Sequence, residues 1–262
     1  MRVSISLGQM QIQFGSPDAN FERARAWTDE AARRGSALAL FPELFLSGYD
    51  LAHREKYATS LGEGAFQKLS ALAKQNHIAL GGSVLELWKG KFYNTFALLD
   101  ADGQCCAVYR KTHLFGLMDE PHWLAAGDTF EQVDMPWGKS GLSICYDLRF
   151  PEMMRRHTAQ GARLVLLVAE WPTKRIAHWQ TLLRARALDN QLFVAGCNCT
   201  GLSGDDMFGG HSTIVDPWGQ AILEGDEQEA LLTAEIDLDV VDRVRRGFPV
   251  LNDRRADLYG SV

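Results

Sequence analysis

An uninterrupted apolar run lies past the middle of the chain, Leu164-Val165-Leu166-Leu167-Val168-Ala169. A strand with one face in water alternates apolar and polar side chains, whereas a continuous run is typical of a strand buried on both faces. The run is far too short to cross a bilayer, because a membrane-spanning helix needs about 20 apolar residues. We therefore predict a sheet that other layers cover on both sides.

Strand and helix patterns alternate on either side of this run. Apolar patterns predict strands at 3–7, 37–41, 78–87, 92–99, 105–109, 142–145, 192–197, 211–215 and 231–236. Helical spacing predicts helices within 21–31, 66–73, 151–160 and 178–190. The glycines at 201, 204, 209 and 210 indicate a loop. Together these patterns predict an α/β fold, a two-sheet sandwich with helices outside both sheets, as one domain over residues 1–262.

Composition and charge exclude several classes of protein. Of the 262 residues, 46% are hydrophobic and 23% are charged, which is ordinary for a globular protein and unlike a disordered or coiled-coil one. The formal net charge of −6 gives no support for a nucleic-acid partner or an anionic membrane surface. The N-terminus lacks a signal-peptide pattern and the five cysteines are an odd number, so we expect reduced thiols in a cytoplasmic protein.

Reactive side chains follow three of the predicted strands. Glu43 comes shortly after strand 37–41, Lys111 follows strand 105–109, and Cys145 ends strand 142–145 shortly before a helix. Binding sites in open α/β sheets form at such strand ends. Each residue alone also has an ordinary interpretation, as a solvated loop glutamate, a surface lysine or a buried inert cysteine.

The three residues together suffice for acyl transfer from an amide. A thiol is only a few per cent ionised at neutral pH, so it needs a base, and Glu43 can take its proton. Lys111 supplies positive charge for the oxyanion of a tetrahedral intermediate. We expect a sharp strand-to-helix turn to expose the thiol of Cys145 and to aim the N–H of Tyr146 at that oxyanion. This chemistry needs no metal and no cofactor.

Three blocks of the sequence resemble the signatures of the nitrilase, or carbon–nitrogen hydrolase, superfamily. The blocks are Phe41-Pro42-Glu43, Tyr109-Arg110-Lys111-Thr112-His113-Leu114-Phe115 and Cys145-Tyr146-Asp147-Leu148-Arg149-Phe150-Pro151-Glu152. They occur in the superfamily's order, and the resemblance extends over essentially the whole chain. It implies a four-layer α-β-β-α sandwich that assembles as a homodimer or a larger homo-oligomer.

The resemblance also implies roles by position. Cys145 corresponds to the nucleophile, Glu43 to the general base and Lys111 to the stabiliser of the tetrahedral intermediate. Many members of the superfamily add a second glutamate shortly after the lysine. Glu120 stands at that position, and Asp119 is its neighbouring competitor.

Further stretches resemble the ω-amidase branch of the superfamily. They are Ala169-Glu170-Trp171-Pro172 with Arg175, then His178-Trp179, and then Ala185-Arg186-Ala187-Leu188-Asp189-Asn190-Gln191. The resemblance implies hydrolysis of the terminal amide of short dicarboxylic acid monoamides such as 2-oxoglutaramate. The free carboxylate of such a small-molecule amide requires a cation, for which Arg175 is the candidate and Lys174 the alternative. Trp171, Tyr146 and Phe115 are the candidates for an apolar pocket wall.

Other functions stay open at this point. An N-carbamoyl amide hydrolase or a nitrilase uses the same catalytic set, and only the pocket separates them. A cysteine–histidine hydrolase requires His113 or His178 at the thiol. A non-catalytic binding protein fits less well with an intact reactive set. Cys197 and Cys199 have a C-x-C spacing without the further ligands of a zinc site, so we expect no metal.

Overall fold

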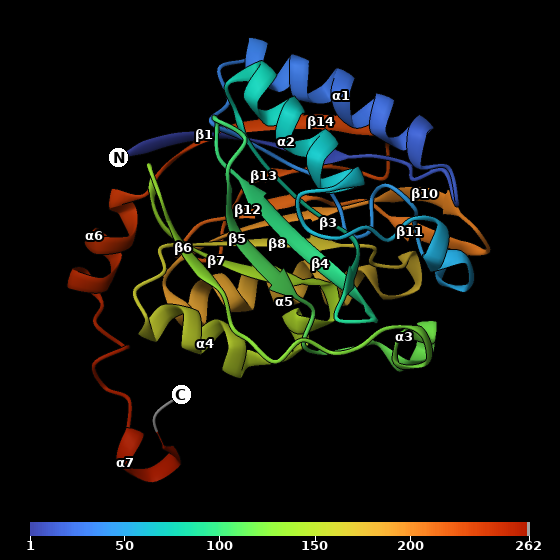
Figure 1. Ribbon diagram of the computed structural model, residues 1–262. Helices are drawn as coiled ribbons and strands as arrows, with labels where there is room; N and C mark the ends of the chain where they lie inside the picture. The colour runs from blue at the N-terminus through green and yellow to red at the C-terminus, as the bar shows by residue number, and fades with distance from the viewer. Residues whose placement is uncertain (261–262) are drawn as a thin grey trace.

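The apolar run forms strand β8 (Leu164–Ala169), and all of its residues are buried in the computed structural model, which describes residues 1–260. β8 lies between two parallel neighbours, β7 (Gly138–Ile144) and β9 (Phe193–Asn198), in a six-stranded sheet. Helices α4 (Pro151–Ala159) and α5 (Ile176–Asn190) cover one face of this sheet, and a second six-stranded sheet covers the other (Figure 1). The predicted burial of both faces is confirmed.

The two sheets follow the same plan of strand directions. In hydrogen-bonded order the first sheet consists of β14 (Ala230–Asp237), β1 (Arg2–Gln9), β2 (Leu38–Leu40), β3 (Ala79–Trp88), β4 (Lys91–Leu99) and β5 (Cys105–Arg110). The second consists of β6 (Gln132–Met135), β7, β8, β9, β12 (Thr213–Val215) and β13 (Ala221–Glu224). Along both orders, successive pairs are antiparallel, parallel, parallel, antiparallel and antiparallel. The two halves therefore repeat one plan without a visible sequence repeat.

Helices complete the outer layers and the connections. α1 (Pro17–Arg33) and α2 (Gly64–Asn76) cover the outer face of the first sheet, on the opposite side of the molecule from α4 and α5 (Figure 1). The remaining described helices are α3 (Glu120–Trp123), α6 (Asp239–Gly247), α7 (Ala256–Tyr259) and the 3₁₀ helices η1 (Leu51–Lys56), η2 (Gly116–Met118), η3 (Cys145–Arg149) and η4 (Thr173–Arg175). Among residues 1–260, no helix has both the length and the apolar character that a membrane crossing requires.

Apolar cores hold the layers together. The largest lies between the two sheets and extends beneath α4 and α5, and it contains Leu7, Phe96 and Val165, which are fully buried. A second core joins the first sheet to α1 and α2 through residues such as Ala31 and Leu72. The predicted α/β class and the four-layer α-β-β-α arrangement are confirmed.

Three local features differ from the prediction. The glycine-rich segment predicted as a loop forms a hairpin of β10 (Thr200–Ser203) and β11 (Asp206–Gly209), because glycines with positive φ allow its tight turns. The strand predicted at 142–145 begins at Gly138 and ends before Cys145, which is the first residue of η3. The patterns also do not predict β6 and β13, since strands of four residues are too short for a clear alternation.

Candidate active site

The structure brings the three predicted catalytic residues together from both sheets. Glu43 follows β2 and Lys111 follows β5 in the first sheet, while Cys145 follows β7 in the second. Lys111 Nζ donates a hydrogen bond to Glu43 Oε1 at 2.7 Å, and both side chains are fully buried. A buried ammonium and a buried carboxylate thus stand next to each other at one end of the site.

Glu120 is the second carboxylate of this cluster. Its Oε1 accepts a hydrogen bond from Lys111 Nζ at 2.7 Å, and its Oε2 accepts one from the Phe115 N–H at 2.6 Å. Asp119 is exposed, so Glu120 and not Asp119 lies beside the lysine. Burial, aided by Glu43 and opposed by Lys111, raises the pKa of Glu120 above its usual value.

Two further members of the cluster were not among the candidates from sequence. The Tyr49 hydroxyl lies 2.9 Å from Glu43 Oε1 and 2.8 Å from Glu120 Oε1, and it accepts a hydrogen bond from Lys111 at 3.4 Å. Asn94 Nδ2 donates to Glu43 Oε1 at 2.8 Å. Asn94 and Thr95 form a buried polar pair within β4, between Tyr93 and Phe96, and that polar interruption is the signal that could have indicated Asn94.

Lys111 stays a cation in this environment. Burial by itself lowers the pKa of a lysine, but the Glu120 and Glu43 carboxylates outweigh burial and raise the pKa of Lys111. The three hydrogens of the ammonium match its three partners, Glu43, Glu120 and Tyr49. The single positive charge of Lys111 therefore neutralises only one of the two carboxylates, Glu43 and Glu120. The cluster carries a net negative charge when both carboxylates are ionised.

Cys145 sits on a strained turn. Its φ of +45° lies in the left-handed region that residues other than glycine rarely adopt. Leu44, directly after Glu43, and Asp119, directly before Glu120, have φ of +42° and +59°. Each such residue costs about 1–3 kcal/mol, and strain of this kind concentrates at functional sites.

The carboxylate of Asp147 supports the turn that carries Cys145. Its Oδ2 accepts hydrogen bonds from the Ile144 N–H and from the Tyr109 hydroxyl, both at 2.8 Å. Its Oδ1 lies 2.7 Å from Nδ1 of His113. His113 therefore contacts Asp147, the residue that supports the turn, and it does not line the cavity that holds the thiol.

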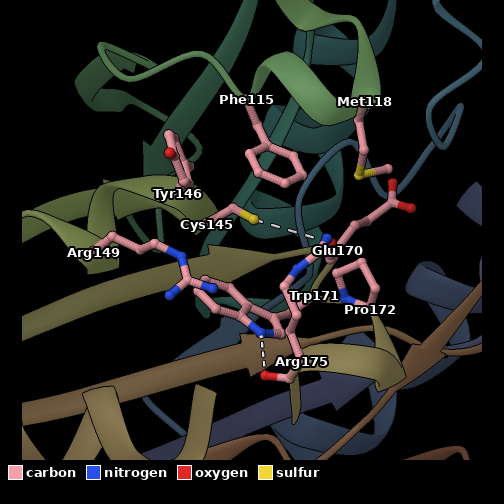
Figure 2. Close-up of a pocket in the computed structure, with 9 residues that line it drawn as sticks. All are labelled: Phe115, Met118, Cys145, Tyr146, Arg149, Glu170, Trp171, Pro172 and Arg175. Carbon is pink, nitrogen blue, oxygen red and sulfur yellow. Dashed lines mark hydrogen bonds between the residues drawn. The ribbon is translucent and has the colours of Figure 1, made fainter. Parts of the chain in front are cut away.

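The Cys145 thiol is almost fully buried, with 6% of the residue exposed, so the expectation of an exposed thiol is wrong. Its Sγ lies 4.0 Å from the carbonyl oxygen of Glu170 (Figure 2). Burial, followed by the Glu43 carboxylate, raises the pKa of the thiol well above its ordinary value, against the opposing effect of Lys111. The resting group is a neutral thiol, which needs a base when it reacts.

A narrow cavity lies beside this thiol (Figure 2). All four predicted substrate-binding residues line it, namely Phe115, Tyr146, Trp171 and Arg175. The lining also contains residues outside that set, namely Met118, Arg149, Glu170 and Pro172. Lys174 is exposed and its Nζ lies 3.8 Å from Asp206, so Arg175 is the member of the pair that reaches the cavity.

Two guanidinium groups give the aromatic cavity a positive side. The Arg175 guanidinium lies 5.1 Å from the centroid of the Phe115 ring, and that of Arg149 lies 4.9 Å from the Trp171 ring. Cation–π attraction stabilises both placements. Arg149 belongs to the third sequence block quoted above, but its spacing from Cys145 does not reveal that it reaches the same cavity.

The described residues are not arranged for a cysteine–histidine hydrolase or for a metal site. His178 Nδ1 lies 3.1 Å from Arg149 Nη2, and neither His178 nor His113 lines the cavity beside the thiol. Within residues 1–260, no group of three or more His, Cys, Asp or Glu side chains is arranged to hold a metal ion.

Comparison with known proteins gives the family. The family model described as carbon-nitrogen hydrolase matches residues 4–246. The chain belongs to the carbon-nitrogen hydrolase family. It is 43% identical over 260 residues to the 2-oxoglutaramate amidase of Bacillus subtilis (strain 168), covering 99% of this chain and all of the relative. It is 37% identical over 270 residues to the omega-amidase NIT2 of Homo sapiens, covering 98% and 97%.

A solved structure agrees with this assignment. Saccharomyces cerevisiae Nit3, a member of branch 10 of the nitrilase superfamily, superposes with a TM-score of 0.90 at 32% identity over 97% of each chain. The predicted fold family and the predicted enzyme class, a carbon–nitrogen hydrolase of the amidase type, are confirmed. The catalytic roles of Glu43, Lys111 and Cys145 in this carbon-nitrogen hydrolase stay predictions.

Proposed function

We propose that this carbon-nitrogen hydrolase converts the terminal amide of short dicarboxylic acid monoamides, of the 2-oxoglutaramate type, to acid and ammonia. The observation that carries the proposal is the cavity beside Cys145. Cys145 lies in its wall and is the electrostatic neighbour of the buried Lys111–carboxylate cluster, and Arg149 and Arg175 line the same cavity. The amide and the carboxylate of one small substrate match these two features. The names of the two relatives point to the same substrate class.

The first half of the reaction forms a thioester on Cys145. Glu43 takes the thiol proton while Sγ attacks the amide carbon, and the negative charge moves to the amide oxygen. Lys111 and the N–H of Tyr146 stabilise that oxyanion, which a buried site favours more strongly than water does. When the C–N bond breaks, the proton on Glu43 passes to the nitrogen and ammonia leaves.

The second half releases the acid. Glu43, ionised again, takes a proton from a water molecule whose oxygen attacks the thioester carbon. The C–S bond breaks, and the proton on Glu43 returns to the sulfur, which restores the neutral thiol. The burial that raises the pKa of Cys145 favours this return, because it makes the thiol the stable resting form.

The charge of the cavity supports an anionic substrate. Arg175 is the carboxylate ligand that the sequence predicts, and Arg149 is a second cation at the same cavity. A guanidinium binds a carboxylate through two parallel hydrogen bonds, so either group gives a directional contact.

The alternative is an N-carbamoyl amide hydrolase or a nitrilase, which requires the same catalytic set. Ammonia release separates these functions when it is measured on four- and five-carbon dicarboxylic acid monoamides, N-carbamoyl amino acids and short nitriles. We expect the highest kcat/KM for the monoamides, and a higher value for nitriles or carbamoyl compounds would contradict the proposal. Cys145→Ala should abolish turnover, whereas Cys106→Ala, which changes an exposed cysteine on β5, should leave it unchanged. Ammonia release by Cys145→Ala would exclude that residue as the nucleophile.

A further inference from the structure

Glu170 is a buried carboxyl group that the proposed reaction does not use. It follows β8 directly, and its main chain is part of the site, because its N–H donates to Glu43 Oε2 at 2.9 Å. The residue is 1% exposed. Within residues 1–260, neither side-chain oxygen has a hydrogen-bond partner. A buried polar group without a partner is costly and uncommon, so it calls for an explanation.

No cation of the site neutralises this group. The ammonium of Lys111 is already bonded to Glu43 and Glu120, and the two guanidiniums of the cavity stack on aromatic rings. Burial, followed by the nearby Glu43 carboxylate, raises the pKa of Glu170 well above its usual value, and Lys111 opposes this only in part. Burial without a hydrogen-bond partner and the raised pKa both favour the uncharged carboxylic acid, which has one hydrogen to donate and a carbonyl oxygen that accepts.

The missing partner can enter through the cavity. Glu170 lines it together with Cys145 and Met118, and Figure 2 shows the carboxyl end of Glu170 beside the side chain of Met118. Met118 is half-buried and belongs to the short helix η2. Its unbranched side chain has three rotatable bonds and adapts its packing readily, so a ligand can displace it from the carboxyl group.

We propose that the Glu170 side chain binds the primary amide of the substrate and so selects it as the group presented to Cys145. The carbonyl oxygen of the acid accepts a hydrogen bond from the amide N–H, and its hydroxyl donates to the amide oxygen. This pairing satisfies both unpartnered oxygens at once. A methyl group in place of the amide nitrogen leaves the acceptor unsatisfied, and a carboxylate cannot supply the N–H. The inference rests on the proposed function, because it takes Cys145 as the nucleophile.

Two small electrophiles test this selection without any turnover. Acrylamide and methyl vinyl ketone both alkylate thiols and have nearly the same shape, but the ketone carries a methyl group where acrylamide carries its NH₂. The rate at which each alkylates Cys145 is measured by peptide mass spectrometry and divided by its rate with free cysteine. Exposed Cys106 in the same sample gives an internal reference. We expect Cys145 to prefer acrylamide by roughly 10-fold on this normalised scale, since one buried hydrogen bond has about that effect.

Variants of Glu170 then assign the preference to its side chain. Glu170→Gln keeps a neutral acceptor and donor of the same shape, and it should retain most of the preference. Glu170→Leu keeps similar bulk without polar atoms, and its preference should fall to within about 2-fold of unity. Equal preferences in the wild-type protein and Glu170→Leu would overturn the inference and leave the proposed function standing. Failure of Cys145 to react faster than Cys106 with either reagent would instead overturn the proposed nucleophile, and the inference with it.

Discussion

Lys111→Met should show how much the buried charge cluster depends on its single cation. Methionine keeps the length of the side chain but removes the ammonium that donates to Glu43 and Glu120 at 2.7 Å each. All three side chains are fully buried, so no water replaces the lost charge. Breaking a buried ion pair by removing one partner costs about 3–5 kcal/mol. We expect the free energy of unfolding to fall by about that amount near pH 8, together with loss of amidase activity.

The loss of stability should depend on pH in a definite direction. Without Lys111, burial and the neighbouring Glu43 carboxylate raise the pKa of Glu120 in the folded protein still further above its value in the unfolded chain. The folded state then binds more protons, so the stability of the variant falls as pH rises above about 4.5, the ordinary carboxyl pKa. The deficit relative to the wild-type protein should therefore be smaller at pH 5 than at pH 8.

Urea unfolding followed by tryptophan fluorescence measures this difference at both pH values. Lys68→Met is the matched control, because its ammonium pairs with Asp18 at 3.2 Å on the surface, where an ion pair contributes about 1 kcal/mol or less. The double variant Lys111→Met with Glu120→Gln should regain part of the lost stability, since one of the two opposed charges is gone. If Lys111→Met is as stable as the wild-type protein at pH 8, or its deficit grows on acidification, the buried-charge argument is wrong.

Three further outcomes follow from the geometry. Glu43→Gln should lower kcat by about 10²–10⁴-fold, since the base acts in both halves of the reaction; steady-state ammonia release checks this, and a loss of only a few-fold argues against the role. Arg175→Ala should raise KM for a dicarboxylic acid monoamide by about 10- to 100-fold, because it removes a charge-assisted hydrogen bond. KM for an uncharged amide such as butyramide should stay nearly unchanged. Equal effects on both amides would exclude Arg175 as a carboxylate ligand. Gly141→Ala should destabilise the protein by roughly 1–3 kcal/mol in thermal unfolding, because its Cβ would lie 2.4 Å from His157 Nδ1 at the contact between β7 and α4; an unchanged Tm would mean that this contact can yield freely.

Local sequence patterns were sufficient for most of the longer strands and helices and for the three reactive strand ends. The apolar run of β8 predicts burial on both faces because periodicity along a strand reports which faces meet water. Glu43, Lys111 and Cys145 were identifiable for a related reason, since chemistry-bearing residues at the ends of apolar strands stand out from their immediate neighbours. The order of the three blocks then indicated the family.

Other features required the tertiary structure. They are the common strand plan of the two sheets, the choice of Glu120 over Asp119, and the place of Tyr49 in the cluster. The same holds for the unpartnered carboxyl group of Glu170 and for the strained φ of Cys145. The physical reason is distance along the chain: Lys111 meets Glu43 across 68 positions, and Glu170 meets Glu43 across 127. Burial and hydrogen-bond partners determine whether a carboxyl group is charged, and both are properties of the surrounding space that a residue's neighbours in sequence do not specify.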